Sequence, residues 1–177
     1  IALMDSGPVS GLASYRAGSA KNSAVYVTNG NEYNFAANED FTVEFWLKLE
    51  EYPAMADANY MYIMHRSTGA ITNDNTKRIW GMYLTSSKAN SGPDVGATIS
   101  IFGPSSPRWE HITGLENLNK WHHIVWMRNG DSIYTFTNGN LDNSASGKGS
   151  IAMTGASGVL SFLGGQNIFG KNISFSE

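Results

Sequence analysis

The chain has 177 residues, a net charge of −3 and 15% charged residues, against about 25% in an average soluble domain. Its length predicts one domain, and 41% hydrophobic residues are enough to build one core. The aromatic content of 12% excludes a disordered chain, and the acidic balance excludes a nucleic-acid binder that relies on a basic field. Because there is no cysteine, disulfides, thiolate metal sites and cysteine nucleophiles are excluded as well.

The sequence divides into an N-terminal arm and a β-rich remainder. Residues 1–22 are rich in Gly, Ser and Ala and lack hydrophobic periodicity, so we expect an arm or linker there. Residues 23–177 show short alternating segments between turn residues, which is typical of a β-sandwich or barrel. The expected strands are 23–28, 32–36, 41–50, 60–67, 78–85, 97–102, 121–129, 131–138, 149–153 and 158–163. The uncharged stretch 149–170 contains six glycines, so it predicts strands and turns and no membrane insertion.

Asn-Gly pairs mark three of the expected turns: Asn29-Gly30, Asn129-Gly130 and Asn138-Gly139. Such pairs supply the positive φ angles of a type I′ hairpin turn. Asn129-Gly130 lies between two alternating segments, so it predicts a β-hairpin.

The segment 41–50 predicts a strand with one buried face and one solvent-exposed face. The apolar side chains on one face are Phe41, Val43, Phe45, Leu47 and Leu49. Trp46 is the exception on the other face, where its neighbours are Glu44 and Lys48. This position favours two hypotheses for Trp46, a structural role or contact with a ligand.

The segment 121–129 has apolar residues on both faces, which predicts a central strand covered on each side. By the same reasoning Trp80, Trp121 and Trp126 are expected in the core. His122 and His123 are neighbours on this strand and face opposite ways, so they cannot chelate one metal together. We expect one packed histidine and one surface histidine.

Two segments carry a resemblance to a known family. They read FTVEFWLK at residues 41–48 and WHHIVWMRNGDSIYTFTNG at residues 121–139. The first resembles the early strand, and the second the later hairpin, of laminin-G-like domains in the concanavalin A-like lectin/glucanase superfamily. The resemblance implies an all-β fold, a jelly-roll sandwich of two antiparallel sheets. It also implies a recognition or adhesion module on extracellular, cell-surface or phage proteins, with glycan ligands and sometimes calcium.

The end of the chain departs from the family pattern. Gly170–Ile173 resembles the opening of the family's final strand, but the sequence stops at Glu177. We therefore expect a jelly-roll domain over 23–177 whose last strand is either short or missing. A missing strand would expose a sheet edge to a partner.

The sequence does not carry the residues of a glycoside hydrolase. Retaining members need two carboxylates about 5–5.5 Å apart, here expected on one strand face. The nearest candidates are Glu44 and Glu50, but Trp46 stands where the family's Glu-x-Asp-x-x-Glu spacing has an aspartate. No Gly-x-Ser-x-Gly elbow occurs either. We expect a non-catalytic protein.

Aromatic side chains beside polar ones are the candidate ligand-binding residues, because sugars stack on flat rings and hydrogen-bond to polar groups. Trp109 and Arg108 lie in a proline-bounded segment, 103–111, which predicts a loop. Trp109 there is either a ligand platform or a lid over the end of the sandwich. Trp46 and Tyr62 complete the predicted site.

Asn and Asp residues near expected turns are weak candidates for structural calcium, which binds several oxygen ligands. They are Asn38, Asp40 and Asp74. The alternative is ordinary turn chemistry, since these side chains hydrogen-bond their own backbone.

The leading hypothesis is therefore a recognition module that binds glycans or a glycosylated surface, located outside the cell, at the cell surface or on a virion. The alternative is a structural domain of a virion fibre, capsid decoration or extracellular filament, as a homo-oligomer or with other subunits.

Overall fold

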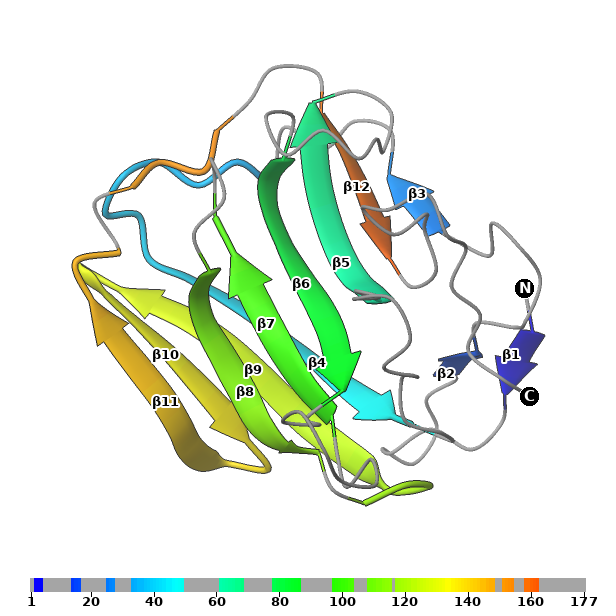
Figure 1. Ribbon diagram of the computed structural model, residues 1–177. Coiled ribbons are helices and arrows are strands. Elements are labelled where there is room, and N and C mark those ends of the chain that lie inside the picture. Colours follow the sequence, from blue (N-terminus) through cyan, green and yellow to red (C-terminus); the bar gives the residue numbers. More distant parts are fainter. Residues whose placement is uncertain are drawn as a thin grey trace.

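The computed structural model describes residues 2–4, 14–16, 25–27, 33–49, 61–68, 78–86, 97–103, 108–115, 117–148, 151–154 and 158–162. These residues form twelve strands and no α-helix (Figure 1). The strands are β1 (Ala2–Met4), β2 (Ser14–Arg16), β3 (Val25–Val27), β4 (Phe41–Lys48), β5 (Met61–Thr68), β6 (Arg78–Ser86), β7 (Ala97–Phe102), β8 (Arg108–Leu115), β9 (Trp121–Asn129), β10 (Ser132–Thr137), β11 (Asn140–Ser146) and β12 (Gly158–Phe162).

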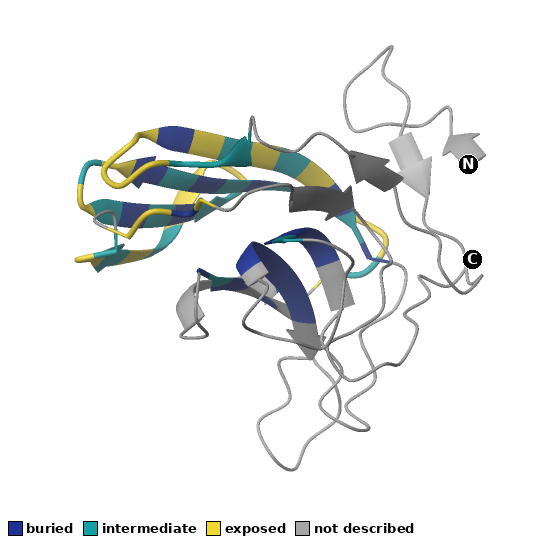
Figure 2. Ribbon diagram, turned by 90° about the horizontal axis from the view of Figure 1, so that it is seen from above, coloured by how far each residue is buried: buried dark blue, intermediate teal, exposed yellow. Residues whose placement is uncertain are grey.

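Two antiparallel sheets form the sandwich, which confirms the predicted fold class. One sheet has four strands in the order β11-β10-β9-β4, and the other has six in the order β3-β12-β5-β6-β7-β8. Viewed from above, they are two layers with the buried residues between them (Figure 2). Strands β1 and β2 pair with each other as a separate two-stranded sheet inside the expected arm. The division into an arm and a domain stays a prediction, as does the state of the last strand, which lies outside the described residues.

Four strands were not predicted: β1 and β2 in the expected arm, and β8 and β11 in the domain. Two of the predicted strands are reduced to a single contact. Strand β8 follows a proline-containing segment, and it forms through long-range pairing with β7, including Ile112 opposite Ile99. Strand β11 has small polar residues of low strand propensity, and a tight turn folds it back onto β10. The expected strands 32–36 and 149–153 are instead represented by one isolated bridge between Phe35 and Met153.

The predicted hairpin at Asn129-Gly130 is confirmed, but its turn differs from the expected type. Asn129 pairs with Ser132, so the two turn residues are Gly130 and Asp131, and only Gly130 has a positive φ (57°). The next hairpin has the type I′ pattern instead, because Asn138 and Gly139 lie between paired strand ends with φ of 53° and 81°. The first Asn-Gly pair, 29–30, lies outside the described residues.

The core lies between the inner faces of the two sheets. Trp80 of β6 and Trp126 of β9 are fully buried with ring centroids 5.7 Å apart, as predicted. Phe41 packs edge-on against Trp126 at 4.7 Å and is stacked on Phe35 at 4.3 Å. The alternation predicted for 41–50 is also confirmed, because Leu47 and Leu49 are buried while Trp46 is exposed.

Strand β9 corrects one prediction. It is central, but only the face with His122, Ile124, Trp126 and Arg128 is buried. The opposite face, which includes Trp121, is half-exposed along its length. Trp121 was predicted in the core, and this is wrong because no layer of described residues covers the outer face of this sheet. In strand β6, by contrast, residues 79–84 are buried on both faces.

Arg128 is a buried cation that ties the end of β9 to two irregular segments. Its guanidinium donates hydrogen bonds to the carbonyl oxygens of Ala36 and Glu39, and to that of Ile151 at 3.2 Å. It also lies over the ring of Phe41, 4.9 Å from the centroid. Burial lowers the pKa of the Arg128 guanidinium, while Glu39 and the neighbouring Asp40 act to raise it. The N–H groups of the guanidinium thus hydrogen-bond to carbonyl groups that have no partner within a β-sheet.

Replacing Arg128 by Met should lower the free energy of unfolding by about 3 kcal/mol, because three carbonyl oxygens lose a hydrogen bond from the guanidinium and, among the described residues, only that of Ala36 keeps another donor, the Glu39 N–H. Arg128→Lys should be nearly as unstable, since one ammonium cannot reproduce the fork. Urea denaturation measures both, with the exposed Lys120→Ala as a control expected within about 0.5 kcal/mol of wild type. A loss below about 1 kcal/mol for Arg128→Met would show that the Arg128 hydrogen bonds do not stabilise the fold.

Candidate functional site

The outer face of the four-stranded sheet is the surface on which aromatic and charged side chains come together. It is defined by the strand positions that alternate with the buried ones. The members on β4 and β9 are Thr42, Glu44, Trp46, Lys48, Trp121, His123, Val125 and Met127. Figure 2 shows this alternation as bands of buried and more exposed residues along the strands. We call this surface the outer face.

Trp46 is the centre of the outer face. It is 42% exposed, although a tryptophan side chain is usually buried. The register places it directly opposite His123, and the two rings lie 4.9 Å apart between centroids at 31°. The Nε2 of His123 in turn lies 3.4 Å from Oε2 of Glu44. The indole therefore has one side supported by an imidazole and still presents a large exposed area.

A second aromatic group lies diagonally beside the first. Lys48 is opposite Trp121 in the same register, and its Nζ lies 5.4 Å from the centroid of the Trp121 ring. This is within the range of a cation–π contact. Diagonal neighbours across two antiparallel strands are about 7–8 Å apart, so Trp46 and Trp121 are adjacent on the face. The face thus combines two indoles with a cation on one and an imidazole on the other.

A hydrogen-bonded clamp fixes the strand end that carries His123. In the type I′ turn, the Asn138 N–H donates to the carbonyl oxygen of His123 at 2.8 Å, and Oδ1 of Asn138 accepts from the His123 N–H at 2.9 Å. Its Nδ2 then faces Nδ1 of the buried His122 at 3.4 Å. Because Nε2 of His122 lies 3.2 Å from the carbonyl oxygen of Asn117, Nε2 carries the proton and Nδ1 accepts. One packed and one partly exposed histidine were predicted, and both are confirmed.

The other predicted site residues lie on the opposite sheet. Arg108 and Trp109 begin strand β8 at the edge of the six-stranded sheet, so the loop predicted for them is wrong. Pairing with β7 makes this segment a strand, with a register shift beside Phe102 that leaves Trp109 unpaired. Tyr62 lies in β5 opposite Tyr83. The side chains of Arg108, Trp109 and Tyr62 are outside the described part of the structure, and their role stays a prediction.

The structure does not bring the candidate calcium ligands together among its described residues. Asn38 and Asp40 lie in the exposed turn before β4, and Asp74 is outside the described residues. Oδ1 of Asp40 accepts a hydrogen bond from the Gly130 N–H at 2.6 Å, which is the turn role given as the alternative. Within the described ranges, no three His, Asp or Glu side chains are grouped as a cation site. Calcium binding by Asn38, Asp40 and Asp74 stays a prediction.

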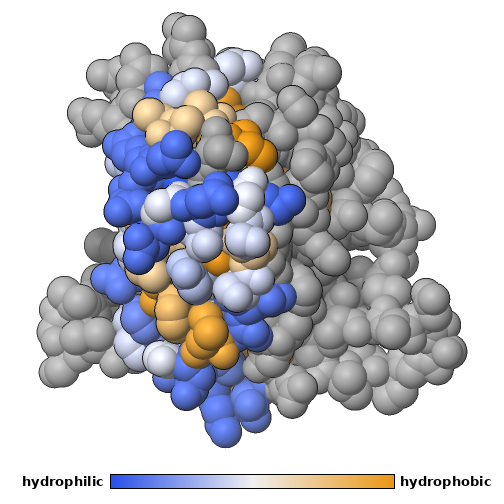
Figure 3. All heavy atoms as spheres, turned by 90° about the vertical axis from the view of Figure 1, so that its left-hand side faces the viewer, coloured by the Kyte–Doolittle hydropathy of each residue, from blue (hydrophilic) through white to orange (hydrophobic). Residues whose placement is uncertain are grey.

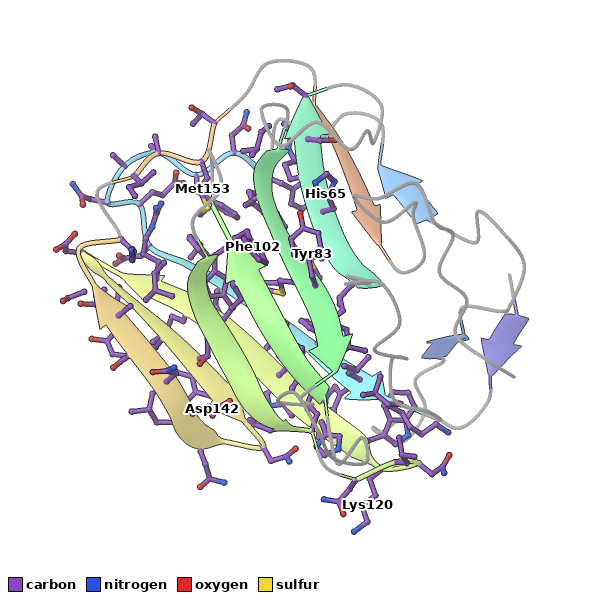
Figure 4. The ribbon with its side chains drawn as sticks, viewed as in Figure 1. His65, Tyr83, Phe102, Lys120, Asp142 and Met153 are labelled. Atoms are coloured by element: carbon purple, nitrogen blue, oxygen red, sulfur yellow. The ribbon has the colours of Figure 1, made fainter. Side chains whose placement is uncertain are left out.

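Figure 4 shows that the six-stranded sheet carries a packed row of side chains, with His65, Tyr83 and Phe102 on adjacent strands. The rings of Tyr83 and Phe102 meet edge to face at 5.0 Å, and His65 is 6.0 Å from Tyr83. A Cβ at Gly81 would lie 2.8 Å from the Tyr83 hydroxyl oxygen, so glycine makes room for this ring. His65 and Tyr83 are buried, in contrast to Trp46 on the other sheet.

The side of the molecule along β11 is mostly hydrophilic, with small separate hydrophobic patches (Figure 3). The exposed large hydrophobic side chains of the described residues are Trp46, Leu141 and Ile151. They lie on different elements, so exposed apolar groups are single side chains and the outer face offers a mixed aromatic and polar surface.

Together these features define an antiparallel two-sheet sandwich of the lectin-like class, with an aromatic platform on one sheet. A family model described as the concanavalin A-like lectin/glucanases superfamily matches residues 19–175. The chain belongs to this superfamily, which confirms the resemblance seen in the sequence. The superfamily's name covers both sugar-binding proteins and glucan-degrading enzymes.

Similar solved structures share the fold at low sequence identity. The heptameric SAP-like pentraxin from Limulus polyphemus aligns with a TM-score of 0.56 and 14% identity, over 92% of this chain and 69% of the pentraxin. The binding domain of Paraclostridial Mosquitocidal Protein 1 aligns with a TM-score of 0.54 and 18% identity, over 89% of this chain and 37% of that domain. The chain thus spans little more than a third of the toxin domain. No curated protein matches the chain.

The described residues contain no helix that is long and apolar enough to cross a membrane.

Asn138 offers a matched pair of variants that separates its side-chain bonds from its backbone conformation. Asn138→Gly keeps a residue suited to φ of 53° but loses the bonds to His122 and His123, and should cost about 1 kcal/mol. Asn138→Ala adds the strain of a left-handed residue, about 1 kcal/mol more. Chemical denaturation measures both values, and two variants as stable as wild type would exclude the clamp.

Proposed function

We propose that this chain is a non-catalytic recognition module that binds glycans, free or on a glycosylated surface, through the outer face around Trp46. The single observation that carries the proposal is the exposure of 42% of Trp46 on a strand face, with His123 and Glu44 beside it. An indole held flat at the surface can stack on the C–H face of a sugar ring. Membership of a superfamily that contains lectins supports the same ligand class.

The groups around Trp46 are suited to hydroxyl-rich ligands. The carboxylate of Glu44 is 65% exposed and can accept hydrogen bonds from sugar hydroxyls. The imidazole of His123 and the ammonium of Lys48 can donate to sugar oxygens. Because β4 and β9 hold all of these groups in one register, the platform is formed before the ligand arrives.

A non-catalytic role is supported by the surroundings of Glu44. To act in a retaining glycoside hydrolase, Glu44 would need a second carboxylate about 5–5.5 Å away. Glu44 instead faces His123 at 3.4 Å, and two positions further along its strand is Trp46. Glu50, the other candidate of the sequence, lies outside the described residues. Hydrolysis of a β-glucan that disappears in Glu44→Gln would contradict this part of the proposal.

We place the module in a larger extracellular, cell-surface or virion-surface protein. The low charge and abundant small polar residues suit a surface that is soluble and forms hydrogen bonds with hydroxyl groups. The alternative is a structural domain of an assembly. If no glycan binds in the following experiment and sedimentation detects a homo-oligomer, that alternative is supported.

Trp46→Ala should weaken glycan binding by about 2 kcal/mol, roughly thirtyfold in Kd, because it removes the stacking platform. Trp46→Phe should keep part of the affinity, since a smaller ring remains. A broad glycan panel identifies the ligand, and calorimetry then gives the Kd of each variant. The matched control is Ile151→Ala, which removes another exposed apolar side chain away from the sheet.

The same titrations are made with and without a calcium chelator. We expect the affinity to be unchanged, because the platform binds through rings and one carboxylate. A panel on which no glycan binds, or an unchanged Kd for Trp46→Ala, would overturn the proposed function.

A further inference from the structure

We infer that the ligand of the outer face is an acidic glycan, whose anionic group binds at Lys48 and Trp121 beside the Trp46 platform. This inference rests on the proposed function and adds the chemical class of the saccharide. Its basis is Lys48, a cation on the outer face that has no carboxylate partner among the described residues.

Lys48 is placed on the outer face by the alternation of β4, with Leu47 pointing into the core and Trp46 two positions away on the same face. Its ammonium lies 5.4 Å from the centroid of the Trp121 ring. The charged end of Lys48 thus lies over an indole ring on the outer face. Lys48 forms no ion pair with a carboxylate among the residues that the structure describes.

The negative charge of the same strand does not neutralise Lys48. Glu44 is four residues away, which is about 13 Å along an extended strand. This distance exceeds the Debye length of about 8 Å at physiological ionic strength. Glu44 is also engaged locally, with its Oε2 at 3.4 Å from Nε2 of His123. Among the described residues, the charged group of the outer face beside Trp121 is therefore the Lys48 ammonium.

Lys120 is a cation next to the start of β9, but it is not part of the outer face. It directly precedes Trp121 in a turn, is exposed, and points away from the sandwich in Figure 4. On β10, the positions of the same face are Tyr134 and Phe136, which register opposite Met127 and Val125 and carry no charge. Among the described residues of these three strands, the lysine on the outer face is therefore Lys48, on the Trp121 side of Trp46.

The spacing fits one saccharide ligand. Trp46 and Trp121 are diagonal neighbours, about 7–8 Å apart at the Cβ positions. A sugar ring stacked on Trp46 can therefore place a carboxylate or sulfate of the same or the next residue against Lys48. A carboxylate and a sulfate share this anionic chemistry, and the experiment distinguishes them.

The experiment compares glycans that differ only in charge. Binding of wild-type protein is measured by calorimetry to polygalacturonate and its methyl ester, and to dextran sulfate and dextran. We expect a charged member to bind at least about fivefold more tightly than its neutral partner, and the difference to shrink at high salt. Preference within the first pair indicates a carboxylate, and within the second a sulfate.

Variants assign the effect to the lysine. Lys48→Gln keeps the aliphatic stem and removes the charge, so it should lower affinity for the charged glycan about threefold to fivefold and leave the neutral one unchanged. Lys148→Gln, a charge removal beyond β11, should have no effect. Glu50→Gln removes a carboxylate that follows Lys48 by two residues in the sequence, and should strengthen anion binding.

The possible outcomes separate the two proposals. Equal binding of charged and neutral glycans, with Trp46→Ala impaired toward both, overturns the acidic-glycan inference and leaves the glycan-binding module standing. A charge preference that persists in Lys48→Gln also overturns it, since the anion then binds elsewhere. If none of the four polymers and no panel glycan binds, the proposed function itself fails.

Discussion

The pairing of β4 with β9 is the constraint on which the rest of this molecule depends. One antiparallel register, from Phe41 opposite Arg128 to Lys48 opposite Trp121, serves both faces of the sheet. On the inner side it puts Phe41 against Trp126, and on the outer side it puts Trp46 against His123. Because side chains alternate along a strand, a slip of one residue would send Trp46 inward and bring Leu47 to the surface. Core and candidate site are therefore specified by the same set of backbone hydrogen bonds.

Much of this arrangement could be predicted from the sequence, because local patterns carry it. The alternation in 41–50 gave the buried and exposed sides of β4 and singled out Trp46. The Asn-Gly pair at 129–130 located the hairpin, although its turn uses Gly130 and Asp131. Strands β8 and β11 were missed because their own residues do not favour a strand. Pairing with the preceding strands, β7 and β10, forms them.

The site could be predicted only in part, because pairing between distant segments brings some of its members together. Trp46 and its neighbour Lys48 on the same strand face were identified, but Trp121 and His123 join them through a register between segments about 75 residues apart, which no local pattern specifies. Trp109, Arg108 and Tyr62 were grouped with Trp46 because they share its chemistry, yet they lie on the other sheet. The apolar content of both faces of β9 suggested two covering layers. The structure instead leaves the outer face of β9 half-exposed, as an aromatic surface.

Arg128 has a consequence for how the sandwich opens. The residues around 36–40 and 151–153 belong to no ladder, apart from the bridge of Phe35 with Met153, so by themselves they would fray independently. The guanidinium joins them to the centre of a sheet through carbonyl groups on both segments. Local release of either segment must then break bonds to a buried cation, which is as costly as disrupting the core beside it. In native-state hydrogen exchange, the amides of Phe35 and Met153, which bond to each other's carbonyl groups, should therefore exchange together with those of β9 as one cooperative unit.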